Sequence, residues 1–113
     1  MSTSALVTAV QALGASRVEA LLVGHLLKHG QAATSDLMAT TGLRQPEVSV
    51  GMRVLRERGW VQAEPIPRAG KGRPMHAYRL VAPAATVRNY YEGLGQAAMR
   101  RFETALHDLR RLA

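Results

Sequence analysis

The stretch "GLRQPEVSVGMRVLRERGW", residues 42–60, places a proline and four arginines within one short amphipathic helix. Pro46 suits the first helical turn, where a missing backbone N–H costs nothing, and the helix is expected to end at Gly59. At about 100° per residue, the inward side consists of Val48, Gly51, Met52 and Leu55, and the outward side of Pro46, Ser49, Val50 and Arg53. Gly51 is expected to let the preceding helix approach closely.

The outward side has the chemistry of a surface that enters the major groove of DNA. Its side chains are short, its first half carries a single charge at Arg53, and it presents no acid that phosphates would repel. The stretch therefore predicts a DNA-recognition helix. An ordinary amphipathic helix whose arginines are merely solvated is the alternative.

The neighbouring segments favour the DNA-binding interpretation. Upstream, "QAATSDLMATTG" (31–42) begins with a short link, after which Thr34 or Ser35 is expected to cap a brief helix that ends at Gly42. Two short helices joined by a glycine-containing turn are typical of a helix-turn-helix. Downstream, "WVQAEPI" (60–66) and "HAYRL" (76–80) are expected to be two strands joined by the basic hairpin tip "PRAGKGRPM" (67–75).

The ends of the chain are predicted to be helical. Residues 4–13 form a short alanine-rich segment, and residues 16–30 form a helix that Ser16 and Glu19 open with capping-box spacing. Residues 84–113 read as one long helix, with Gly93 and Gly95 as its weak points. The predicted fold is mainly α with a small β-hairpin wing: a winged helix-turn-helix domain over residues 1–82, followed by a C-terminal helix over residues 83–113.

The residues of this region resemble a known family. "GLRQPEVSVGMRVLRERGWV" (42–61) is similar to the recognition-helix segment of prokaryotic winged helix-turn-helix transcriptional regulators of the ArsR and MarR type. The matching positions are Leu43, Gln45, Pro46, Val48, Ser49, Leu55, Gly59 and Val61, with Met52 and Trp60 as apolar substitutes. "GKGRPMHAYRL" (70–80) resembles the wing, so the likeness covers roughly residues 18–82. It is specific for the fold but not for an operator.

The resemblance implies a set of DNA-binding residues. It makes Gln45, Ser49, Val50 and Arg53 the residues that face the groove, and Arg44 adds positive charge where phosphate contacts are expected. The wing residues that would reach the backbone or the minor groove are Arg68, Lys71 and Arg73. The net charge of +7, with 15 Lys and Arg against 8 Asp and Glu, also favours a polyanionic partner. A soluble protein that is basic for another reason is the alternative.

The last helix carries an apolar seam with steps of three and four residues. The predicted dimer interface comprises Tyr91, Leu94, Ala98, Phe102, Ala105, Leu109 and Leu112. The helix could instead pack on its own domain, but it has more seam than a small domain can cover. A homodimer is therefore expected, with help from the N-terminal helix.

Catalytic and metal sites are not expected. The chain has no cysteine, and no serine, histidine and acid form a recognisable catalytic motif. His25 and His29 have the four-residue spacing of a metal pair, but such a pair on a leucine-rich helix more often packs or faces solvent. We expect no cofactor, no metal and no enzymatic activity. The N-terminal segment has no basic region before its apolar residues, and Gln11, Arg17 and Glu19 interrupt any membrane-length run. A cytoplasmic, nucleoid-associated protein is therefore expected.

The expected function is that of a homodimeric, sequence-specific regulator of transcription that binds double-stranded DNA. The main alternative is an architectural or chromatin-type protein that coats DNA with little sequence preference. A winged helix that binds another protein fits the charge poorly. Whether a small-molecule effector exists cannot be predicted from the residues.

Overall fold

The computed structural model describes residues 3–66 and 75–113. Its elements, in order, are α1 (Thr3–Ala12), α2 (Arg17–His29), β1 (Gln31–Ala33), α3 (Thr34–Thr41), α4 (Gln45–Glu57), β2 (Val61–Ile66), β3 (Met75–Leu80) and α5 (Ala84–Leu112). This mainly helical arrangement with a small antiparallel sheet confirms the predicted winged helix-turn-helix fold class.

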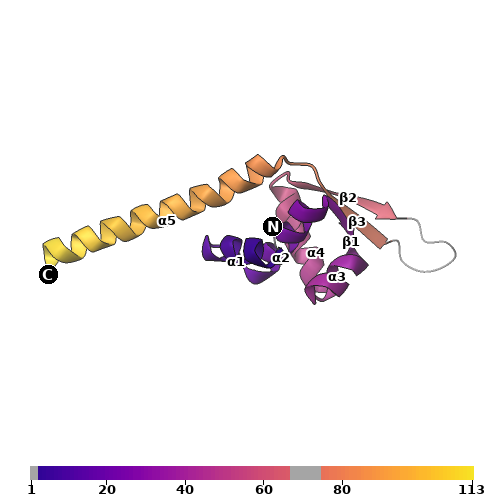
Figure 1. Ribbon diagram of the computed structural model, residues 1–113, viewed down its shortest axis with the longest axis horizontal. Helices are drawn as coiled ribbons and strands as arrows, with labels where there is room; N and C mark the ends of the chain where they lie inside the picture. The colour runs from indigo at the N-terminus through magenta and orange to yellow at the C-terminus, as the bar shows by residue number, and fades with distance from the viewer. Residues whose placement is uncertain (1–2, 67–74) are drawn as a thin grey trace.

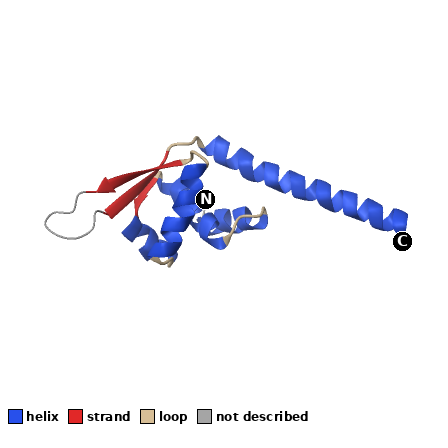
Figure 2. Cartoon of the chain, turned by 180° about the vertical axis from the view of Figure 1, so that it is seen from behind, coloured by secondary structure: helices blue, strands red, loops and turns tan. Residues whose placement is uncertain are grey.

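The molecule consists of a packed winged domain and a projecting helix. Helices α1 to α4 and the sheet gather at one end, and α5 leaves them as a long rod (Figure 1). The reverse view shows the sheet and the C-terminus at opposite ends of the molecule (Figure 2), whose principal extents are 69 × 27 × 25 Å. Among the residues that the structure describes, most of α5 therefore has no neighbour from the winged domain.

The core of the winged domain forms around α2. Leu22 and Leu26 of α2, Leu37 of α3, and Val48, Met52 and Leu55 of α4 are fully buried together. Each such side chain contributes about 1.5–3 kcal/mol when it leaves water. Burial of the predicted inward side of α4 orients its opposite side outward.

The sheet has a strand that the sequence did not predict. The strand order is β1-β3-β2 with both pairs antiparallel, so β3 is central. Residues 31–33, expected to be a link, pair with β3 in a register that sets Ala32 opposite Tyr78. The prediction was wrong because Gln-Ala-Ala has no marked strand preference, and long-range pairing with β3 makes it a strand.

Of the two predicted helix caps, one is confirmed and one differs from the structure. Ser16 caps α2 as expected, since its Oγ accepts from the Glu19 N–H at 3.1 Å. Helix α3, however, has Ala33 at its N-cap, because Thr34 lies inside the helix and its hydroxyl donates to the His76 carbonyl of β3 at 3.3 Å. Thr34 thus ties the helix to the sheet.

Gly51 lets another helix approach α4 closely, as predicted, but that helix is α2 and not the preceding helix α3. A Cβ at Gly51 would lie 2.5 Å from Leu22 Cδ1 and 3.0 Å from Val18 Cγ1. Both neighbours belong to α2, whereas the preceding helix is α3. The missing side chain therefore seats the recognition helix on the central helix of the domain.

Candidate nucleic-acid interface

The turn between α3 and α4 is closed by local contacts. Gly42 adopts a left-handed conformation with φ 76°, and its N–H donates to the Met38 carbonyl at 3.0 Å. The Thr41 hydroxyl oxygen accepts from the N–H of Leu43, whose side chain is buried. These contacts fix the angle between the two helices of the helix-turn-helix.

The first turn of α4 exposes a cation. The Glu47 carboxylate accepts from the backbone N–H of Arg44 at 3.0 Å, and this hydrogen bond lowers the pKa of Glu47. Arg44 Nε lies 3.5 Å from the same carboxylate, yet the Arg44 side chain remains 84% exposed. Arg44 therefore lies at the helix start, where a phosphate contact was predicted.

The outward side of α4 is open to solvent as the helical spacing predicted. Gln45, Pro46, Ser49, Val50 and Arg53 are all exposed, and Val50 has 59% of its surface accessible. This face offers a short hydroxyl, an amide, an aliphatic group and one guanidinium. Such groups can approach base edges and thymine methyl groups without repulsion from phosphates.

A groove runs between α4 and β2, where the recognition helix meets the wing. Its lining residues are Arg53, Arg56, Glu57, Val61, Gln62 and Ala63. Within the described ranges, Arg53 and Arg56 form no ion pair, so both guanidinium groups are available to an anion. Arg56 was absent from the predicted set, although its spacing of three from Arg53 could have indicated it.

The described part of the wing has its own polar contacts. Arg79 of β3 donates to Gln62 Oε1 at 3.0 Å and lies 3.5 Å from Glu64 Oε1 of β2. These contacts link the two wing strands across the hairpin. The predicted wing cations Arg68, Lys71 and Arg73 lie outside the residues that the structure describes.

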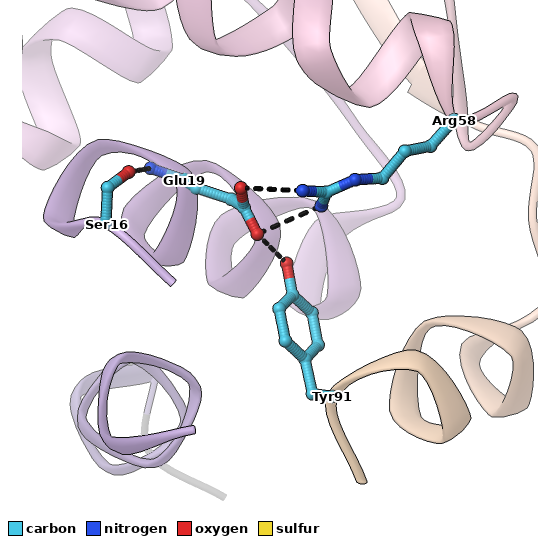
Figure 3. Close-up of polar contacts among 4 residues, drawn as sticks. All are labelled: Ser16, Glu19, Arg58 and Tyr91. Carbon is cyan, nitrogen blue, oxygen red and sulfur yellow. Dashed lines mark hydrogen bonds and ion pairs between the residues drawn. The ribbon is translucent and has the colours of Figure 1, made fainter. Parts of the chain in front are cut away.

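A network centred on Glu19 joins α2, α4 and α5 (Figure 3). Arg58, which follows α4, donates to both Glu19 carboxylate oxygens at 2.9 and 3.0 Å, and the Tyr91 hydroxyl of α5 donates to Glu19 Oε2 at 2.5 Å. The side chains of Arg58 and Glu19 are only 24% and 14% exposed. We call these three residues the Glu19–Arg58–Tyr91 network.

The electrostatics of the network favour the ionised pair. Burial raises the pKa of Glu19, but hydrogen bonds from Arg58 and Tyr91 and the charge of Arg58 outweigh burial and bring the pKa below its ordinary value. Burial and the hydrogen bond to Glu19 raise the pKa of Tyr91. Tyr91 therefore stays protonated as a donor while Glu19 stays charged as an acceptor.

Aromatic rings surround the Arg58 guanidinium. Its carbon lies 4.9 Å from the centre of the Trp60 ring and 4.5 Å from that of Tyr90. Trp60 also packs edge-on against Tyr90 and Tyr91, with ring centres 5.1 and 5.7 Å apart. The start of β2 is thereby joined to the N-terminal part of α5.

The network corrects two predictions made from the sequence. The Glu19 carboxylate bonds to Arg58 and Tyr91, so we replace its expected capping-box role with an interhelical one. Tyr91, predicted to lie in the dimer interface, is only 3% exposed, and its own domain occupies its surface. Sequence reasoning missed the network because Arg58 and Tyr91 lie 39 and 72 residues from Glu19 in the chain.

Beyond Tyr91 the large apolar side chains along the seam of α5 are exposed in the part of the chain that the structure describes. Leu94, Phe102, Leu109 and Leu112 have exposed fractions of 37%, 69%, 62% and 74%, and Met99 and Leu106 extend the same stripe. Ala98 and Ala105 lie between them and leave room for a neighbouring helix. Gly95 contacts Leu13, since a Cβ there would lie 2.5 Å from Leu13 Cδ2.

The two histidines of α2 lie next to each other, with His25 buried and His29 exposed. The ring centre of His25 lies 4.4 Å from that of His29, and burial lowers the pKa of His25. Residues 3–66 and 75–113 contain no group of three or more histidines, cysteines or acids arranged to hold a metal. None of the helices in these ranges has both the length and the apolar character needed to cross a bilayer.

Comparison with known proteins identifies the fold. No protein-family model and no curated protein sequence matches the chain. A possible transcriptional regulator from Methanosarcina mazei Go1 is similar in structure, with a TM-score of 0.58 and 18% identity over 86% of this chain and 81% of its own. A MarR family transcriptional regulator from Silicibacter pomeroyi has a TM-score of 0.56 and 16% identity over 97% of this chain and 78% of its own.

A third similar structure is a chromatin protein. TrmBL2, an archaeal chromatin protein, has a TM-score of 0.60 and 20% identity over 98% of this chain, which spans only 40% of the length of TrmBL2. Identities of this size establish a common architecture and not a shared activity. The chain therefore has the winged helix-turn-helix fold that MarR-type regulators and an archaeal chromatin protein share.

Proposed function

We propose that the chain is a homodimeric, sequence-specific regulator of transcription that binds double-stranded DNA. Helix α4 enters the major groove, and the wing follows the flanking backbone. The observation that carries the proposal is the outward side of α4, where exposed Gln45, Ser49, Val50 and Arg53 present small and polar groups on a rigid helix. A major groove about 12 Å wide accepts such a helix and displays the base edges that these groups can read.

The distribution of charge supports a nucleic acid as the partner. Arg44 at the start of α4 can approach phosphates on one side of the helix. Arg53 and Arg56 beside the wing, which have no ion pair within residues 3–66 and 75–113, can do so on the other. The net charge of +7 adds a long-range attraction to DNA. In this proposal the protein has no catalytic step and no cofactor, and it is cytoplasmic and nucleoid-associated.

The exposed seam of α5 supports dimerisation. A stripe running from Leu94 to Leu112 would be stabilised if a second copy of the helix covered it. Two-fold symmetry then places two recognition helices on half-sites about 34–36 Å apart, which is one turn of DNA. The expected target is a roughly palindromic site.

The architectural alternative has one observation in its favour, which is the structural similarity to the chromatin protein TrmBL2. The same fold can coat DNA if α4 contacts only phosphates. A regulator should prefer its site over random DNA by about 10³ or more, whereas a coating protein should not. Selection from random duplexes would supply the preferred site for this comparison.

The test of the proposal is Arg53→Ala, measured on the selected duplex and on a scrambled one. If Arg53 reads a guanine with two hydrogen bonds, its loss should cost about 1–3 kcal/mol on the selected duplex and much less on the scrambled one. Arg100→Ala, on the exposed side of α5 opposite the apolar seam, is the matched control because it removes the same charge away from both the recognition helix and the proposed dimer interface. Equal weakening of both duplexes by Arg53→Ala would favour the architectural role.

A further inference from the structure

We propose that the Glu19–Arg58–Tyr91 network sets the direction in which α5 leaves the winged domain. Given the dimeric function proposed above, the same network would determine which half-site spacing a dimer can bind. The three residues would then be positioning residues for DNA binding, although none of them lies on the outward side of α4.

One carboxylate contacts three elements at once. Glu19 of α2 receives two hydrogen bonds from Arg58, at the end of the recognition helix, and one from Tyr91 of α5. Hydrogen bonds to charged groups are directional and stronger than neutral ones. A tilt of α5 relative to α4 would lengthen at least one of these bonds.

The other attachments of α5 are aromatic or apolar, because Arg58 and Trp60 stack on Tyr90 and Trp60 packs edge-on against Tyr91. Among its residues only Val87 and Tyr91 are buried, and after Tyr91 its large apolar side chains are exposed. The contact between Leu13 and Gly95 is apolar and offers no directional bond. Within residues 3–66 and 75–113, the hydrogen bond from Tyr91 to Glu19 is thus the directional side-chain hydrogen bond that can fix the angle of α5.

Helix α5 is long enough to turn a small change of angle at Tyr91 into a large displacement of its C-terminal end. From Tyr91 to Leu112 the helix extends about 32 Å at 1.5 Å per residue. A rotation of about 10° at Tyr91 would move the far end by about 5 Å, which exceeds the 3.4 Å rise of one base pair. Small changes in the network would thus alter the separation of two winged domains that are joined through α5.

The main variant is Tyr91→Phe, which removes only the hydroxyl group that contacts Glu19. Tyr90→Phe is its matched control, because the adjacent Tyr90 stacks on Arg58 and Trp60 but is not a partner of Glu19. Glu19→Gln is a second variant that keeps the shape of the side chain and removes its charge. Circular dichroism establishes that each variant is folded.

The first measurement does not depend on DNA. Because the chain has no cysteine, Thr40→Cys on α3 and His107→Cys on α5 allow two spin labels to be attached without background. Labelled protein is diluted with unlabelled protein, so that the distances within one chain dominate. Tyr91→Phe and Glu19→Gln should shift or broaden the distance distribution by about 4 Å for every 10° of rotation, and Tyr90→Phe should leave it unchanged.

The second measurement is binding to duplexes whose two half-sites are moved apart or together by one and two base pairs. Tyr91→Phe should keep the affinity for a single half-site but reduce the preference for the best spacing by about tenfold. Label distances that do not change in Tyr91→Phe and Glu19→Gln would overturn the proposal. Changed distances with an unchanged spacing preference would overturn its DNA-binding part. If the unmodified protein binds no duplex, the proposed function fails, while the label distances still decide the role of the network.

Discussion

Helices α4 and α5 are both amphipathic, and they differ in what covers their apolar side. In α4, Val48, Met52 and Leu55 are buried against the rest of the winged domain. In α5, Phe102 and Leu109 repeat at similar spacing, yet 69% and 62% of their surfaces are exposed. Helical periodicity thus identifies an apolar stripe, but it does not show whether the same chain or another one covers it.

The two helices should differ most in how a Leu→Ala substitution changes the free energy of unfolding. Leu55→Ala should lower the free energy of unfolding by about 2–5 kcal/mol at every protein concentration, because it leaves a cavity in the core. Leu109→Ala should matter only where the dimer is populated, so its effect should vanish on dilution. Urea unfolding at several protein concentrations distinguishes the two. A concentration-independent loss for Leu109→Ala would mean that its own domain covers α5.

Charge in the seam of α5 should convert dimers to monomers. The double variant Leu109→Glu with Leu112→Glu places two carboxylates in the seam. Because they would be buried without partners in the dimer, association should weaken by tenfold or more. Sedimentation should show the monomer, and DNA binding should weaken because each half-site then contributes alone. The control is Gln96→Glu with His107→Glu, which adds two glutamates at exposed positions on the opposite side of the same helix. A monomeric unmodified protein at micromolar concentration would contradict the proposed dimer.

The comparison also shows what could be predicted from the residues. The inward side of α4 was predictable, because Val48, Met52 and Leu55 repeat with the helical period and only one core is available to a small domain. The exposed Gln45, Ser49, Val50 and Arg53 follow from the same period. The long helix was predictable in a similar way from its uninterrupted three- and four-residue steps.

The features that were missed depend on residues far apart in the chain. Strand β1 exists because β3 lies beside it, since Gln31, Ala32 and Ala33 carry little strand preference themselves. The role of Glu19 was hidden because a Glu three residues after Ser16 already has a local explanation in a capping box. Arg58 resembles any other arginine of a basic helix until the fold brings it to Glu19 and Tyr91.

Glycine substitutions should distinguish the covered helix from the open one. Gly51→Ala should destabilise the protein by about 1–3 kcal/mol, since its Cβ would lie 2.5 Å from Leu22, whose side chain is fully buried. Gly93→Ala should instead stabilise it by about 0.5–1 kcal/mol, because a Cβ at Gly93 meets no atom within 4 Å and alanine favours the helix. Thermal unfolding measures both. A destabilising Gly93→Ala would indicate that something packs on that side of α5.

The smallest expected effect is that of acid on the Glu19–Arg58–Tyr91 network, which joins α4 to α5. Protonation of Glu19 should weaken this network. The pKa of Glu19 lies below the ordinary value of 4.5, so the folded state binds fewer protons than the unfolded state. The stabilisation is therefore present above about pH 5 and is lost as the pH falls through the folded pKa, by at most about 1.4 kcal/mol per pH unit for one group.

His25, whose pKa burial also lowers, should add a separate loss that begins below its ordinary value of 6.5. Glu19→Gln isolates the carboxylate, since it keeps His25 but has no group to protonate at position 19. Unfolding can be followed by fluorescence of the single tryptophan, Trp60, which lies beside Arg58 and Tyr91. The unmodified protein should lose stability relative to Glu19→Gln only below about pH 5. Parallel curves from pH 7 to 3 would mean that the charge of Glu19 does not join α4 to α5, and that apolar contacts alone hold the two helices together.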